Sequence, residues 1–106
     1  MRRLAPFLVL LLGACAGSGQ PDPGPTPARG ETLAARQCSG CHALGPVGDS
    51  PRAAAPPFRD LALRNNELAL ERRLSAMNGQ PHYEMPRVIL QPGEISDLAA
   101  YIAGSR

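Results

Sequence analysis

The sequence of 106 residues has no lysine and no tryptophan, so all 11 of its basic side chains are arginines. Two of them, Arg2 and Arg3, stand at the extreme N-terminus, and without the first 14 residues nine basic and nine acidic residues remain. The net charge of that remainder is zero. Because a nucleic-acid-binding protein keeps a basic excess, the composition argues against nucleic acid as a partner.

Aromatic side chains are also scarce: beyond the N-terminal segment they are Phe58, Tyr83 and Tyr101. A domain of about 80 residues with so few large side chains usually needs disulfides, a metal or another staple. Three cysteines are too few for a disulfide scaffold, and they are unevenly placed. The shortage therefore predicts that a cofactor supplies part of the core.

Residues 1–14 are typical of an export signal, with two arginines, the apolar run Leu4 to Leu12 and small residues at its end. The run is too short to cross a bilayer, which takes about 20 residues. Leu12-Gly13-Ala14-Cys15 resembles a bacterial lipobox, which predicts a lipid on Cys15 and membrane attachment through its acyl chains. Ordinary cleavage at Ala14-Cys15-Ala16 is the alternative, and it would leave a free thiol.

Residues 15–28 are rich in proline and glycine, with prolines at the alternate positions 21, 23, 25 and 27. Such a segment favours an extended chain that reaches about 3 Å per residue. We expect a tether that holds a folded domain, residues 29–106, away from a membrane.

Three helices are predicted in that domain, and no segment alternates well enough for a strand. The first runs from Gly30 to about Gln37, the second follows a cap at Asn65 or Asn66 and stops at Gly79, and the third runs from Pro92 to Gly104. Residues 43–60 are interpreted as loop. The predicted fold class is all-α.

Cys38-Ser39-Gly40-Cys41-His42 has the spacing of a c-type haem attachment site. Two thiols three residues apart on one helical face are each able to add to a vinyl group of one porphyrin. The adjacent His42 then brings a ring nitrogen to the iron. An export signal upstream suits attachment of haem outside the cytoplasm.

Three other interpretations of Cys38 and Cys41 are weaker. A thioredoxin-like redox pair needs strands around it, a zinc site has only His82 left as a further ligand, and a structural disulfide leaves His42 unexplained.

A haem in an electron carrier takes a second axial ligand. Met85, followed by Pro86, lies in a proline-bracketed loop that is able to fold back over the porphyrin, and a thioether raises the reduction potential relative to a second imidazole. The alternative ligand is His82. Met77 lies on the apolar face of the second predicted helix and is expected in the core.

Together these residues resemble class I c-type cytochromes, the small monohaem electron carriers of bacteria. The resemblance covers about residues 29–106. It rests on Gly30, Cys38-x-x-Cys41-His42, Ala55-Pro56-Pro57-Phe58, Met85-Pro86 and the last helix with Tyr101. It implies that the first and last helices cross closely at Gly30 and Tyr101. It also implies that a carbonyl of Pro56 or Pro57 bonds the proximal histidine. Gln91 stands where the family usually has a Ser or Thr helix cap.

The expected function is one-electron transfer by a single covalent haem c, with His42 and Met85 as axial ligands and no enzymatic activity of its own. The alternative is a sensor or peroxidase-like haem module with an open or bis-histidine iron. The expected setting is the periplasm, on a membrane, as a monomer that meets redox partner proteins such as a respiratory complex, a dehydrogenase or an oxidase.

Overall fold

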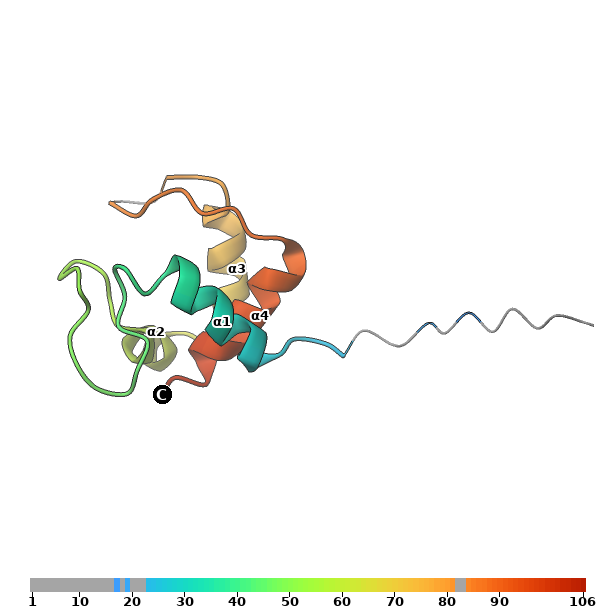
Figure 1. Cartoon of the computed structure of the whole chain (residues 1–106), viewed down its shortest axis with the longest axis horizontal. Coiled ribbons are helices and arrows are strands. Elements are labelled where there is room, and N and C mark those ends of the chain that lie inside the picture. Colours follow the sequence, from blue (N-terminus) through green and yellow to red (C-terminus); the bar gives the residue numbers. More distant parts are fainter. Residues whose placement is uncertain (1–16, 18, 20–22, 82–83) are drawn as a thin grey trace, which may run out of the picture.

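The computed structural model describes residues 17, 19, 23–81 and 84–106. These residues form four helices, α1 (Pro27–Gln37), α2 (Phe58–Arg64), α3 (Glu67–Met77) and α4 (Pro92–Ala103), and no strand (Figure 1). The all-α fold class is confirmed. No helix in this described part of the chain combines the length and the apolar character needed to span a bilayer.

Helix α4 is the centre of the fold, because α1, α2 and α3 all pack against it. Its buried apolar residues Ile95, Leu98, Ala99 and Ile102 recur at helical spacing and form one face. Pro92 suits the first helical position. Glu94 closes the first turn, because its Oε2 accepts the Gln91 N–H at 2.8 Å. Glu94 therefore satisfies a backbone donor at the end where Gln91 stands in place of a Ser or Thr cap.

Helix α1 crosses α4 (Figure 1). At Gly30 the backbone of α1 comes very near Asp97 and Tyr101 of α4. A Cβ atom on Gly30 would overlap the Asp97 carbonyl and lie 2.7 Å from Cβ of Tyr101. Only glycine fits this crossing, which agrees with the close contact implied by the resemblance. Helix α1 begins at Pro27, so its first turn includes Pro27 and Ala28, which were predicted to belong to the tether.

Helix α2 is an addition to the predicted elements, since its first three residues lie in the segment interpreted as loop. It has only seven residues, of which Phe58 and Ala62 are buried, and it packs against α4. Helix α3 begins after Asn66, whose side chain accepts the Ala69 N–H at 2.8 Å. Of the two candidate caps, Asn66 is the one used.

The core contains residues of all four helices and of the loops next to them. It is built from Leu33, Ala34, Cys38, Phe58, Leu70, Leu90, Ile95, Leu98, Ala99 and Ile102. Met77 is half-buried at the end of α3. Cys38 is thus both a core residue and the first residue of the haem attachment motif.

Candidate haem site

The Cys38–His42 segment continues directly from the end of α1. Cys38 is the C-cap, and its N–H donates to the Ala34 carbonyl at 2.8 Å. Its own carbonyl accepts the N–H groups of both Cys41 (3.1 Å) and His42 (2.9 Å). This tight turn fixes the spacing between the two thiols and places the imidazole directly after them.

Both thiols are free, with Cys38 buried and Cys41 half-buried. Burial, and to a smaller extent the neighbouring Cys41, raises the pKa of the Cys38 thiol to about 11. Cys38 is therefore a protonated thiol at neutral pH. Among the described residues no group of three or more His, Cys, Asp or Glu side chains is arranged to hold a metal ion.

Among the described residues, the imidazole of His42 makes one hydrogen bond and one ring contact. Its Nδ1 lies 2.7 Å from the Pro56 carbonyl oxygen. Because a carbonyl only accepts, Nδ1 carries the proton and Nε2 is left with a free electron pair for a metal. The ring of Phe58 packs beside it, with centroids 5.4 Å apart, and Phe58 in turn meets Tyr101 at 6.1 Å.

The structure distinguishes the two candidate prolines. The Pro56 carbonyl meets the imidazole, whereas the Pro57 carbonyl accepts the N–H groups of Asp60 and Leu61 at the start of α2. The Pro57 carbonyl is therefore used by the first turn of α2, and the Pro56 carbonyl is left to accept the hydrogen bond from His42. The sequence alone left this choice open because it did not reveal α2.

Met85 lies half-buried in the segment between α3 and α4. Within the described residues it makes no hydrogen bond to the Cys38–His42 segment, but its neighbour does connect to that side. Glu84 Oε2 pairs with the Arg52 guanidinium at 2.8 Å, and the Arg52 N–H donates to the Cys41 carbonyl at 3.2 Å. The alternative ligand His82 and the lipidation candidate Cys15 lie outside the described residues.

Neither a role for Glu84 nor its pairing with Arg52 was predicted from the sequence. The hydrogen bond to Glu84 is the largest cause that raises the pKa of Arg52, and Cys41 adds a smaller effect. The two residues are 32 positions apart, and no periodic pattern or motif joins them. Only the folded arrangement of the loops shows the pairing.

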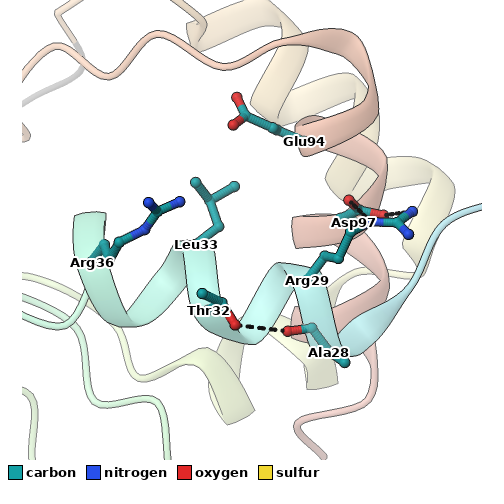
Figure 2. A pocket seen from close by; sticks show the side chains of 7 residues that line it. All are labelled: Ala28, Arg29, Thr32, Leu33, Arg36, Glu94 and Asp97. Carbon is teal, nitrogen blue, oxygen red and sulfur yellow. Dashed lines mark hydrogen bonds and ion pairs between the residues drawn. The ribbon is translucent and has the colours of Figure 1, made fainter.

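A separate pocket lies between α1 and the first turns of α4 (Figure 2). Arg29 and Asp97 pair at one end of it, and Leu33, Arg36 and Glu94 extend toward it from the two helices. It contains none of Cys38, Cys41, His42 and Met85. It is therefore distinct from the segment that carries the haem attachment motif.

The donor set fits a covalent haem. Two free thiols stand one turn apart, and an imidazole with a fixed tautomer follows them. Comparison with family models gives a match to Cytochrome c over residues 27–105. The chain belongs to the cytochrome c family. Searches of the curated proteins and of the solved structures gave no match.

Membership in the cytochrome c family confirms the haem and the class of function. Proteins of this family bind covalent haem c and generally carry electrons rather than catalyse reactions. The cofactor of this chain is therefore haem c, and its role is haem-based electron transfer. The match begins at the first residue of α1 and ends just beyond α4.

Proposed function

We propose that this cytochrome c is a one-electron carrier whose haem has His42 and Met85 as axial ligands. Cys38 and Cys41 would hold the porphyrin through thioether bonds, each formed when an S–H adds across a vinyl double bond. The observation that carries the proposal is the His42 arrangement, in which the 2.7 Å bond from Nδ1 to the Pro56 carbonyl leaves Nε2 for the iron. The haem would supply a redox-active iron, able to accept one electron from a donor protein and pass it to an acceptor.

With His42 and Met85 both bound to it, the iron would have no open position for a substrate. The protein would then carry electrons and not catalyse a reaction at the iron. A thioether ligand raises the reduction potential relative to a second imidazole. The position of Met85 supports its role as the second ligand. It lies half-buried directly after Glu84, which pairs with Arg52, and the Arg52 N–H bonds the Cys41 carbonyl. Met77 ends α3 and serves as the comparison methionine.

The test is the visible spectrum of the purified holoprotein, oxidised and reduced, with a pyridine haemochrome assay. We expect a covalent c-type haem and the ferric iron–methionine charge-transfer band. Met85→Ala should lose that band and allow carbon monoxide to bind the reduced protein, whereas Met77→Ala should keep the band.

Other outcomes separate the alternatives. Covalent haem without the band in the wild type contradicts ligation by Met85 and favours His82 or an open iron, as in a sensor or peroxidase-like module. A colourless protein from a host that matures c-type cytochromes contradicts the haem site itself.

We also propose that the protein works in the periplasm as a monomer, attached to a membrane through a lipid on Cys15. The export signal and the lipobox-like Leu12-Gly13-Ala14-Cys15 support this location. Its partners would be redox proteins of the respiratory chain or a periplasmic dehydrogenase or oxidase. Encounters between electron carriers are small and transient, which suits a mobile tethered domain.

A further inference from the structure

Hydrogen bonds hold together the two ends of the segment that carries Met85. The Asn78 side chain, just after α3, makes two bonds to Leu90: its Nδ2 donates to the Leu90 carbonyl at 2.9 Å, and its Oδ1 accepts the Leu90 N–H at 2.7 Å. The Gly79 N–H donates to the Val88 carbonyl at 2.9 Å, and Gly79 has a φ of 70°, which favours glycine. We call residues 79–81 and 84–88 the methionine loop.

The methionine loop has a second attachment farther from its base. In its described part, residues 79–81 and 84–88, the only side-chain bond that leaves the loop is that of Glu84 to Arg52, at 2.8 Å. Glu84 directly precedes Met85. The outer part of the loop is therefore tied to the rest of the domain next to the residue that would ligate the iron.

Arg52 belongs to the other side of the proposed haem site. Its N–H donates to the Cys41 carbonyl at 3.2 Å, and its carbonyl accepts the Ala55 N–H at 3.0 Å, one residue before Pro56. Arg52 is thus part of the hydrogen-bonded backbone that includes residues Cys38–His42, called here the haem attachment segment, and leads to the Pro56 carbonyl bonded to His42. Its side chain connects this network to the methionine loop.

We propose that Arg52 and Glu84 are positioning residues that latch the methionine loop to the haem attachment segment and keep the Met85 sulfur at the iron. This inference rests on the proposed ligation by Met85. The bonds between Asn78 and Leu90 hold the base of the loop whether or not the latch forms. Loss of the latch should therefore change only how often the Met85 sulfur leaves the iron.

The size of the effect follows from exposure. The side chains of Arg52 and Glu84 are 46% and 69% exposed. Ion pairs this exposed are weak and are screened by salt. Loss of the latch should therefore make Met85 easier to displace without abolishing its ligation, and the affinity for a competing ligand should rise about two- to fivefold.

The experiment uses holoprotein and imidazole, which competes with Met85 for the iron. Loss of the iron–methionine charge-transfer band during an imidazole titration gives the affinity. The variants are Arg52→Gln, Glu84→Gln, the double variant and the charge exchange Arg52→Glu/Glu84→Arg. The control is Arg59→Gln, since the Arg59 guanidinium bonds the Gly45 and Gly48 carbonyls and not the methionine loop.

We expect both single variants to bind imidazole more tightly, the double variant to add nothing further, and the charge exchange to restore the wild-type affinity. The differences should shrink at high salt, and Arg59→Gln should match the wild type. A general loss of structure would not be rescued by exchanging the two charges.

The latch is overturned if Glu84→Gln matches the wild type while Arg52→Gln does not, since Arg52 would then act on another group. If the effects of the two single variants add fully in the double variant, the two residues act independently and the latch is also overturned. If the wild type has the band and no variant changes the affinity, only the latch fails. If the wild type lacks the band, ligation by Met85 fails and the latch fails with it.

Discussion

Asp97 is a buried carboxylate, 6% exposed, on a helix whose other inward residues are apolar. Its two oxygens accept bonds from the Thr26 N–H at 2.8 Å and from the Arg29 guanidinium at 2.8 and 3.0 Å. The bond from Arg29, together with that from Thr26, lowers the pKa of Asp97, although burial acts in the opposite direction. The ionised form of Asp97 therefore stabilises the folded domain.

Asp97→Asn should lower the free energy of unfolding of the holoprotein by about 1 kcal/mol at pH 7, because it removes the ion pair with Arg29. The contribution is present above the ordinary carboxyl pKa of 3.8 and is lost as the pH falls through the lower value in the folded state. Denaturant unfolding at pH 7 and at decreasing pH measures it.

Asp49→Asn is the matched control, since Asp49 is an exposed carboxylate. It should leave stability unchanged. A difference between wild type and Asp97→Asn that stays constant down to low pH would contradict the role given to the ionised carboxylate.

Single residues differ in how well the sequence predicts them. The proposed haem attachment residues Cys38, Cys41 and His42 could be predicted from local spacing, because their chemistry needs neighbouring positions. Asp97 and Arg29 are 68 positions apart, and their pairing exists only after α1 and α4 cross. The choice of Pro56 over Pro57 likewise depends on where α2 begins.

At the scale of elements, the crossing of α1 and α4 depends on the missing side chain of Gly30. Overlap with the Asp97 carbonyl and with Tyr101 would force the helices apart. The same helices carry the bonds to Asp97 and the start of the haem attachment segment. Their separation would therefore disturb more than one part of the domain.

Gly30→Ala should destabilise the holoprotein by about 1–3 kcal/mol, as overpacking in a close contact does. Gly93→Ala, in the first turn of α4, meets no atom within 4 Å and should be neutral or slightly stabilising. Thermal or denaturant unfolding of the two variants compares them. Equal stability of both variants would show that the crossing yields easily to a methyl group.

Helices α3 and α4 were predicted from periodic apolar residues and residues typical of helix ends, and α1 from an acidic first turn and a small apolar patch. The structure contains all three. Helix α2 was not predicted, because seven residues after Pro56-Pro57 are too few to show a period. The start of α1 was placed three residues late, since Pro27 ends a run of alternating prolines and yet suits the first helical position.

At the scale of the whole molecule, the chain enters α1 at one end and the haem attachment segment leaves from the other (Figure 1). The N-terminal segment therefore meets the domain at a distance from Cys38 and His42. In a membrane-attached protein this arrangement separates the anchor from the site that exchanges electrons.

Cys15→Ser should release the protein from membranes of a host that processes bacterial lipoproteins, because no acyl chains would be added. Fractionation followed by mass spectrometry of the mature N-terminus measures this. Ser18→Ala, in the same segment, keeps the lipobox-like residues and should remain on the membrane. Unchanged membrane association of Cys15→Ser would contradict the lipid anchor.

The bonds of Asp97 also decide where a mechanical load on the N-terminal segment enters the domain. Thr26 passes tension to α1 through the chain and to α4 through its N–H on Asp97, next to the tight crossing at Gly30. Cys38 lies at the opposite end of the 11-residue helix, about 16 Å away. A pull on the segment is thus shared by α1 and α4, at the end of α1 that lies opposite the haem attachment segment.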